Sequence, residues 1–511
     1  MKKTLSFLTA LLLASAMLYG GGIITNTNQS ASWVRMPARA ATVGLDAVYY
    51  NPAGLSLLPS NGFFVSLNNQ TIGQKRTITS TYTLLNESEY TGEVSAPLFP
   101  SVYAGYKTDK FTVSFGFLPI GGGGGAKYNA GVPSFEYPLT DLVPALALAG
   151  VNAYRADIFF EGTSVFFGYQ LAFTYKINDM ISVAIGGRYV MAKETYAGHL
   201  NDIEVYNYMN SAAWTRADVI MTGIAASATT SGSNLQAAID GGLLQANDPA
   251  SLTVIGGLAQ LGVNATGYTN AQAVAAFQGA AAQYTARATL LGNQEADAKK
   301  SGSGFTPMIS VNFHPSDKLN IAAKYEHNTK LELKNETTKD IIVGFTQTGT
   351  PITQFPDGAK ARLDIPGTIS LGATYKPVDK LLVSAAFYYY LEKSANWAGR
   401  QDSLDANSFE LALGLEYKLT DKLLVSGGFL YTKPGTTPAY NNDLSFNVQS
   451  CTFGIGAAYK INDMIEIEAG GSYTIYTDGS KDMVRNTVNF KETYDKSTWI
   501  VGLGVNLYFN K

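Results

Sequence analysis

The residues that most often carry out catalysis are scarce in this chain of 511 residues. It contains three histidines, His199, His314 and His327, and one cysteine, Cys451. A hydrolase needs a nucleophile held against a histidine, and no nucleophile motif accompanies any of the three. A single cysteine cannot form an internal disulfide or a thiolate cluster. We therefore predict no enzymatic activity, no catalytic residue, no metal site and no cofactor.

A glycine run follows a proline in the first third of the chain. The run is Gly121, Gly122, Gly123, Gly124 and Gly125, and Pro119 lies just before it. It is not a phosphate-binding loop, because Ala126 stands where that loop needs a glycine before its lysine. Proline cannot donate a ladder hydrogen bond, and glycine weakens or bends a strand. The run is therefore either a break in a strand that begins at Phe111 or the start of a flexible loop.

Three basic residues could bind an acidic group of a ligand. By strand alternation Arg188 and Lys324 face the interior of the fold expected below, and Lys193 lies near the end of the same strand as Arg188. For Arg188 and Lys324 the alternative is that they pair with interior-facing carboxylates, which is the commoner arrangement for buried charges. The interior-facing carboxylates belong to Glu326, Glu410, Glu416, Glu466 and Glu468.

The composition limits the scaffold that can position these residues. Only 15% of residues are charged, the net charge is −3, and there are 51 glycines and 31 tyrosines. Soluble proteins carry about 25% charged residues, and a nucleic-acid-binding surface would need an excess of basic residues. A mean hydropathy of +0.01 argues against a bundle of membrane helices, whereas the tyrosines, glycines and low charge suit a membrane β-barrel.

The N-terminus has the pattern of an export signal. Lys2 and Lys3 precede an apolar run, Leu5 to Leu18, and Ala14-Ser15-Ala16 fits a cleavage site. The run is shorter than the roughly 20 apolar residues of a membrane-spanning helix. We predict a signal peptide over residues 1–20, cleaved between 16 and 21.

A short motif recurs six times: an aromatic residue, a basic residue, turn-forming residues, an aspartate, then lysine or methionine. The copies begin at Tyr106, Tyr175, Phe313, Tyr375, Tyr417 and Tyr459. Asp, Asn and Pro in the motif favour tight turns, and the flanking residues alternate with period two. Each copy therefore predicts a β-hairpin.

The alternation gives each strand one apolar face and one small or polar face. Before Tyr417, one face carries Phe409, Leu411, Leu413 and Leu415, and the other carries Glu410, Ala412, Gly414 and Glu416. A soluble sandwich would alternate too, but it does not need an aromatic residue at the same position before six turns. An aromatic girdle at a membrane interface does.

The number of turns also predicts the number of strands. Six hairpins supply twelve strands, and one more strand at each end makes fourteen. The first additional strand is expected at Gly62–Gly73 and the last at Trp499–Phe509. We predict an all-β fold, a fourteen-stranded antiparallel transmembrane barrel over residues 61–511 in the outer membrane of a Gram-negative bacterium. Both termini are expected on the short-turn, periplasmic side.

The remaining segments are expected at the other end or inside the barrel. Residues 197–304 form the longest extracellular connection, with several short helices, and residues 334–363 form another. Residues 21–60 do not alternate. Because a barrel of this width is not filled by its own side chains, we interpret residues 21–60 as a plug in the lumen.

One motif in that plug, Asn51-Pro52-Ala53-Gly54, makes the resemblance specific. Together with the strand count, it resembles the FadL family of outer-membrane long-chain fatty-acid transporters, which also includes aromatic-hydrocarbon channels. The resemblance implies an N-terminal hatch inside a fourteen-stranded barrel. It also implies an inward kink in the third strand that opens the wall sideways, for which Pro119 and the glycine run are the candidates.

The expected function is passive uptake of hydrophobic compounds, such as long-chain fatty acids or similar apolar molecules. Substrate would bind the extracellular loops, pass the hatch and leave near the break in strand three. Expected partners are the apolar substrate, outer-membrane lipid and lipopolysaccharide, and the outer-membrane assembly machinery; we expect a monomer and no nucleic acid. The alternatives are a hydrophilic porin, a barrel enzyme or an adhesin.

Overall fold

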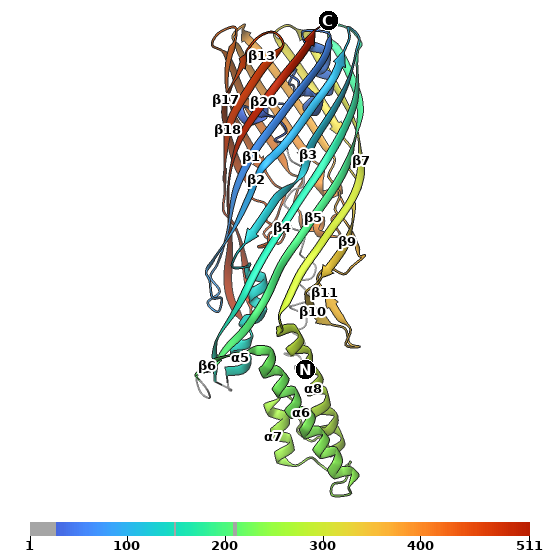
Figure 1. Ribbon diagram of the computed structural model, residues 1–511, viewed down its shortest axis with the longest axis vertical. Coiled ribbons are helices and arrows are strands. Elements are labelled where there is room, and N and C mark those ends of the chain that lie inside the picture. Colours follow the sequence, from blue (N-terminus) through green and yellow to red (C-terminus); the bar gives the residue numbers. More distant parts are fainter. Residues whose placement is uncertain (1–26, 148–149, 208–211, 511) are drawn as a thin grey trace.

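The structure is a computed structural model that describes residues 27–147, 150–207 and 212–510. The expected signal peptide lies outside the described residues. Figure 1 shows a tall barrel with the C-terminus at one end and a bundle of helices projecting from the other. We call these the short-turn end and the long-loop end.

Fourteen antiparallel strands form a closed barrel, as predicted. Strand β1 pairs with both β2 and β20, which closes the ring. The fourteen strands are β1 (Gly62–Ser80), β2 (Glu89–Lys107), β3 (Phe111–Tyr128), β4 (Val151–Lys176), β5 (Ile181–Asn207), β7 (Gln294–Ser316), β8 (Leu319–Glu326), β13 (Thr368–Val378), β14 (Leu381–Tyr390), β15 (Phe409–Lys418), β16 (Leu423–Lys433), β17 (Ser450–Lys460), β18 (Ile465–Tyr476) and β20 (Val488–Asn510).

All six motif turns are hairpins between neighbouring strands, at the end that carries the C-terminus (Figure 1). Their aromatic residues face outward, and Tyr375, Tyr417 and Tyr459 are exposed. On β15 the exposed Leu413 alternates with the buried Ala412. This strand has 10 residues, which is the length that crosses a membrane when tilted. The apolar face therefore covers the outside of the barrel, as expected.

Several strands extend beyond this apolar band at the long-loop end. Strands β4 and β5 have 26 and 27 residues. Six short strands are added there: β6 (Ala213–Arg216), β9 (Glu332–Lys339), β10 (Ile342–Phe345), β11 (Pro351–Thr353), β12 (Lys360–Arg362) and β19 (Gly479–Arg485). Most continue the barrel ladder, whereas β10 and β11 pair only with each other.

The longest connection is shorter and more regular than residues 197–304. Strand β5 continues to Asn207 and β7 starts at Gln294, with pairing up to Leu200–Gln294. The strands extend because their inward-facing Tyr196 and Ala298 pack into a hydrophobic core beyond the apolar band, at the long-loop end. The helices are α6 (Ala217–Asp240), α7 (Leu252–Gln260) and α8 (Asn270–Leu291). Two of them are long rather than short, because α6 and α8 pack along each other as a hairpin.

Four shorter helices cover the long-loop end. They are α4 (Pro133–Thr140) and α5 (Leu142–Leu146) between β3 and β4, and the 3-10 helices η3 (Glu392–Ser394) and η4 (Arg400–Ser403) between β14 and β15. Helices α4 and α5 both pack against β4.

The N-terminal segment lies inside the barrel near the short-turn end (Figure 1), which agrees with a hatch. It contains α2 (Ala31–Arg35), α3 (Ala47–Tyr50) and the 3-10 helix η1 (Pro52–Leu57). Helix α2 contacts β17, β18 and β20, and η1 contacts β4, β5 and β7 on another part of the wall. The segment therefore spans the lumen.

Lumen-facing glycines let the hatch backbone rest directly on the wall. A Cβ added at Gly454 would lie 2.4 Å from the carbonyl oxygen of Val34. One added at Gly470 would lie 2.9 Å from the backbone nitrogen of Arg35. Any larger residue at these positions would push the hatch off the wall.

Candidate functional site

The motif Asn51-Pro52-Ala53-Gly54 forms the first turn of η1. The Asn51 side chain accepts a hydrogen bond from the Gly54 backbone nitrogen at 3.3 Å, and Pro52 occupies the first turn. Asparagine and proline are favoured at these positions. A Cβ at Gly54 would lie 2.3 Å from Asn51 Nδ2, so this turn needs glycine.

The same motif ties the hatch to two strands, β7 and β4. Asn51 Nδ2 donates to Asn312 Oδ1 on β7 at 2.8 Å. The Ala53 backbone nitrogen donates to Ser310 Oγ on β7 at 2.9 Å. From β4, Thr174 Oγ1 donates to the Pro52 carbonyl at 2.7 Å. The motif is therefore an anchor of the hatch rather than a surface that contacts a ligand.

A buried ionic cluster holds the other side of the hatch. Arg35 Nη1 lies 2.5 Å from Glu416 Oε1, and Arg35 Nε lies 3.5 Å from Glu468 Oε2. Within the hatch, Arg39 Nη2 lies 2.8 Å from Asp46 Oδ1. Removing one member of a buried ion pair leaves an uncompensated charge at a cost of about 3–5 kcal/mol. The cluster therefore resists displacement of the hatch.

A polar vestibule of about 480 Å³ lies between the hatch and the short-turn end. Its lining includes Arg35, Arg39 and Glu416 from the cluster, and Asp317 and Lys318 from the turn after β7. Axial passage to this end therefore leads past charged groups.

The predicted basic residues are already occupied or lie elsewhere. Arg188 makes two hydrogen bonds to the Glu326 carboxylate, at 3.0 and 2.8 Å. Lys324 Nζ lies 2.7 Å from Glu326 Oε1 and 2.6 Å from the Tyr49 carbonyl oxygen in the hatch. The pairing alternative therefore describes both. Lys193 is exposed on the outer face of β5, because it has the opposite parity to Arg188, so its assignment to a lumenal site is wrong.

Strands β2 and β3 separate in the middle of the wall. Their ladder runs from Lys107–Thr112 to Val102–Phe117, then resumes only at Val94–Ala126. Strand β3 continues through the glycine run to Tyr128, so the run is not a flexible loop. None of residues 118–125 pairs with β2, and the ladder with β4 is irregular there, with partners at Leu118, Pro119, Gly121, Gly124 and Gly125 and shifts in register between Pro119 and Gly121 and between Gly121 and Gly124. We call this interruption the gap.

The edge of the gap on β2 has few unpaired backbone groups. Pro97 and Pro100 have no N–H to satisfy. Asn69 Oδ1 accepts from the Phe99 backbone nitrogen at 3.1 Å, and Thr71 Oγ1 donates to the Pro97 carbonyl at 3.1 Å. Because an unsatisfied backbone group in lipid costs several kcal/mol, these residues make an interrupted wall tolerable in a membrane.

One hatch residue contacts both edges of the gap. The Gln29 carbonyl accepts hydrogen bonds from Ser101 Oγ and Tyr103 OH of β2, each at 2.6 Å. Gln29 Nε2 donates to the Pro119 carbonyl of β3 at 3.0 Å. The position of the hatch and the width of the gap are therefore physically linked.

A cavity of about 240 Å³ lies beside the gap, on the long-loop side of the hatch. We call it the lumenal cavity. Its lining includes Ala96 and Phe99 of β2, Gly122 of β3 and Trp33 of the hatch. A molecule in this cavity is adjacent to the opening in the wall.

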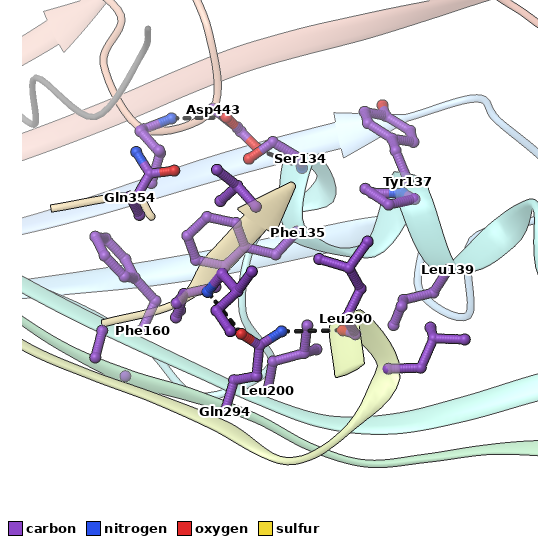
Figure 2. Close-up of a pocket in the computed structure, with 18 of the residues that line it drawn as sticks. Ser134, Phe135, Tyr137, Leu139, Phe160, Leu200, Leu290, Gln294, Gln354 and Asp443 are labelled. Carbon is purple, nitrogen blue, oxygen red and sulfur yellow. Dashed lines mark hydrogen bonds between the residues drawn. The ribbon is translucent and has the colours of Figure 1, made fainter. Parts of the chain in front are cut away.

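A second, largely apolar pocket of about 280 Å³ lies at the long-loop end. Figure 2 shows its side chains converging from α4, β4, β5 and α8. Apolar lining residues include Phe135, Leu139, Phe160, Leu200, Leu290, Leu291, Ile342 and Phe355. Both connections predicted to collect substrate contribute, one through Leu200 and Leu291 and the other through Ile342 and Phe355.

Two polar side chains at the edge of this outer pocket, Gln294 and Asp443, are hydrogen-bonded within the protein (Figure 2). Gln294 Nε2 donates to the Leu290 carbonyl at 2.9 Å, and its Oε1 accepts from the Ile342 nitrogen at 2.7 Å. Asp443 accepts from the Ser134 nitrogen at 2.6 Å, and burial raises the pKa of Asp443. The outer pocket therefore presents mainly apolar surface to a ligand.

Sequence reasoning missed several of these residues. Gln29 lies in the predicted plug, but nothing in its neighbours marks a bridge across the gap. Phe355 lies in a connection expected to collect substrate, but a lone aromatic residue in a loop carries no signal of its own. Among the described residues no acidic, histidine and cysteine side chains cluster as metal ligands. No helix in those ranges is long and apolar enough to cross a membrane.

The comparisons with known proteins agree with this architecture. Residues 163–509 match the family model described as outer membrane protein transport protein (OMPP1/FadL/TodX). The chain belongs to this family. The OMPP1/FadL/TodX assignment places the barrel in the outer membrane and confirms the resemblance found in the sequence. No curated protein matches the chain.

Solved structures of OMPP1/FadL/TodX proteins share the fold at low identity. A Pseudomonas aeruginosa FadL homologue is 14% identical with a TM-score of 0.58, over 95% of this chain and 99% of that one. The P. putida toluene transporter TodX is 12% identical with a TM-score of 0.50, over 97% and 100%. The Ralstonia pickettii toluene transporter TbuX is 13% identical with a TM-score of 0.50, over 96% and 100%.

Proposed function

We propose that the protein carries hydrophobic molecules, such as long-chain fatty acids or aromatic hydrocarbons, passively through the outer membrane and releases them sideways into the bilayer. Membership of an outer-membrane transport family supports hydrophobic transport. Toluene is the substrate named for two proteins of similar fold, TodX and TbuX. The route proposed for this chain has three stages, each tied to one feature of the structure.

The first stage is capture in the outer pocket. Burial of a ligand there is favourable by about 0.8 kcal/mol for each CH₂ group removed from water. Phe135, Phe355 and Leu291 offer the apolar surface. Because burial drives binding, no nucleotide or other energy source is needed at this stage.

The second stage is passage to the lumenal cavity, where the hatch blocks the axial route. An apolar molecule moving on to the periplasm would have to pass the pair of Arg35 and Glu416 and then the polar vestibule. The filled lumen also argues against a hydrophilic porin, which needs an open aqueous channel. No observation in the described residues favours the enzyme or adhesin alternatives.

The third stage is lateral release through the gap, and the interrupted β2–β3 ladder is the observation that carries the proposal. The lumenal cavity reaches both edges of the gap, at Phe99 and Gly122. Gln29 links those edges to the hatch. Withdrawal of the hatch N-terminal end would free both edges at once, so that hatch movement opens the wall.

Filling the gap with side chains tests lateral release. The test variant is Gly121→Val with Gly125→Val, at the edge of the gap. The matched control is Gly427→Val with Gly471→Val; a Cβ at either control glycine has no neighbour nearer than 3.5 Å. We expect the test variant to lose most uptake of labelled toluene and palmitate by cells, while the control retains it. Unchanged uptake by a test variant whose barrel folds normally on heat-shift gels would overturn lateral release.

The remaining assignments are proposals of the same kind. Outer-membrane lipid and lipopolysaccharide would contact the apolar band. The assembly machinery would read the last strand, Trp499–Phe509, and the barrel would act as a monomer. Residues 1–20 would be removed as the signal peptide, and residues 21–60 would act as the hatch domain.

A further inference from the structure

Lys193, which faces outward from β5, belongs to a patch of lysines on the outer wall of the barrel. Ser301 of β7 lies between Lys193 and Lys334 of β9, because the ladder pairs it with both. Neighbouring strands are about 4.8 Å apart, so the backbones of these two lysines are roughly 10 Å apart and their long side chains can reach the same group. The lysine patch consists of five exposed residues, Lys193, Lys299, Lys330, Lys334 and Lys360.

The lysine patch begins where the lipid-facing apolar surface ends. On β5 the exposed Tyr189 and Met191 occupy the two outward positions before Lys193. On β7 the exposed Phe305 lies on the membrane side of Ser301, on the same face. Outer-membrane barrels have short periplasmic turns and longer extracellular loops, so the long-loop end faces the outside of the cell. The patch therefore lies at the level of the lipid head groups of the outer leaflet.

The charges of Lys193 and Lys334 are not compensated across the strands. Among the described residues neither lysine forms an ion pair, and their partners in the ladder are Val165, Ser301 and Lys360 rather than acids. Like charges opposite each other on neighbouring strands, such as those of Lys334 and Lys360, are destabilising. This part of the wall therefore favours an anion supplied from outside the protein.

Two carboxylates lie within the patch, and each faces another lysine. Glu332 Oε1 lies 2.9 Å from Lys360 Nζ, and Glu336 is directly opposite Lys299 in the ladder. The two carboxylates therefore offset the charges of Lys360 and Lys299, and the positive charge on either side of Ser301 remains.

Two outward-facing lysines on another part of the wall have acidic neighbours instead. Lys75 of β1 is directly opposite Glu93 of β2. Lys127 of β3 is opposite the same Glu93 and, on β4, opposite Glu161. On that part of the wall lysine is therefore placed beside acids, whereas in the lysine patch it is placed beside serine and lysine.

We propose that Lys193, Lys334 and Ser301 bind a phosphate group of an outer-leaflet glycolipid, the lipid part of lipopolysaccharide, whose acyl chains lie along Met191 and Phe305. Each lysine ammonium supplies up to three donors and the serine hydroxyl supplies one. Their hydrogen bonds to a phosphate are charge-assisted, and the bound anion removes the repulsion between the cations. A free anion would use the lysines but leave the apolar surface beside them without a partner.

This site lies on the outside of the wall and is independent of the transport route. The proposed contact between the apolar band and outer-membrane lipid needs no particular head group, whereas the lysine patch selects a phosphorylated one. Loss of the site would therefore leave the proposed uptake of hydrophobic molecules standing.

Native mass spectrometry of the full-length, delipidated protein in maltoside detergent tests the site. The lipid probes are diphosphoryl lipid A and the same lipid A with its phosphates removed, which has the same acyl chains. The test variant is Lys193→Gln with Lys334→Gln. The matched control is Lys75→Gln with Lys127→Gln, which removes the same charge from another part of the outer wall. The variant Lys193→Arg with Lys334→Arg keeps both charges.

We expect the test variant to bind diphosphoryl lipid A about 30-fold more weakly than the wild type, the size of effect of two lysines at an anionic lipid surface. The control and the arginine variant should bind it like the wild type, and a large excess of inorganic phosphate should not displace it. Phosphate-free lipid A should bind more weakly to the wild type and equally to all variants.

Three results would overturn the head-group site. One is unchanged affinity for diphosphoryl lipid A in a test variant that folds normally on heat-shift gels. Another is an equal loss for the phosphate-free lipid, which would show that the lysines do not act on the phosphate. The third is displacement of the lipid by inorganic phosphate, which would show a site for small anions rather than for a lipid.

Discussion

Arg35 offers the most direct test of how the hatch is held. Replacing it with methionine keeps much of the side-chain volume but leaves Glu416 and Glu468 without the cation that lies 2.5 and 3.5 Å away. Breaking a buried ion pair in this way costs about 3–5 kcal/mol. Since each 1.4 kcal/mol is tenfold in an equilibrium, the displaced hatch should become about two to four orders of magnitude more populated.

Single-channel recording in planar bilayers would measure that change. The wild type should be almost silent, because its lumen is filled, and Arg35→Met should show frequent transient openings. Adding Glu416→Gln and Glu468→Gln to Arg35→Met should restore silence, since no unpaired charge then remains. Arg155→Met is the control, because the Arg155 side chain is 56% exposed and its pair with Glu204 lies outside the hatch.

Two results would refute this reasoning. One is an Arg35→Met barrel that folds normally on heat-shift gels and remains as silent as the wild type. The other is a triple variant that opens as often as Arg35→Met, which would mean that packing of the arginine, rather than its charge, holds the hatch.

Two further predictions concern the anchor motif and a buried acid. Asn51→Ala should weaken hatch attachment by about 1–3 kcal/mol, through loss of the cap and of the hydrogen bond to Asn312. The variant should therefore show faster trypsin cleavage of the hatch than the wild type, whereas the exposed control Asn264→Ala should not. Equal cleavage rates for Asn51→Ala and the wild type would contradict the prediction. Burial raises the pKa of Glu392, between β14 and β15, to about 7. Since the folded state favours the protonated acid, its contribution to stability is fully present below about pH 4.5 and is lost as the pH rises through 7. Hydrogen exchange of residues 391–408, corrected for intrinsic rates, should therefore accelerate over that range in the wild type but not in Glu392→Gln, and parallel profiles would exclude this role.

The barrel was predictable because its signals are local and repeated. The turn at Tyr417 and the alternation of Leu413 with Ala412 lie within a few residues of each other, so strand positions, facing and number follow directly. The anchor motif could be placed in the lumen because it precedes the first strand. The lengths of the strands beyond the membrane at the long-loop end were harder to predict, because β5 and β7 continue there with side chains that pack on loops.

The contacts that hold the hatch in the lumen could not be predicted, because they join distant parts of the chain. Parity shows that Glu416 faces inward but not that its partner is Arg35, 381 residues away. Pro119 and the glycines marked one edge of the gap, whereas the prolines of β2 carried no such pattern. Lys193 was misassigned although its own parity pointed outward.

The close contact between hatch and wall has a consequence for how the molecule is made. The hatch is joined to β1 by only a few residues, and β1 also forms the final seam with β20 over its whole length from Gly62 to Ser80. Since Gly454 and Gly470 leave no clearance for the hatch backbone, threading it into a finished cylinder would be sterically obstructed. We therefore expect the amino-terminal segment to be placed in the lumen before the first and last strands join, and bulky insertions between residues 27 and 60 to stall that last step.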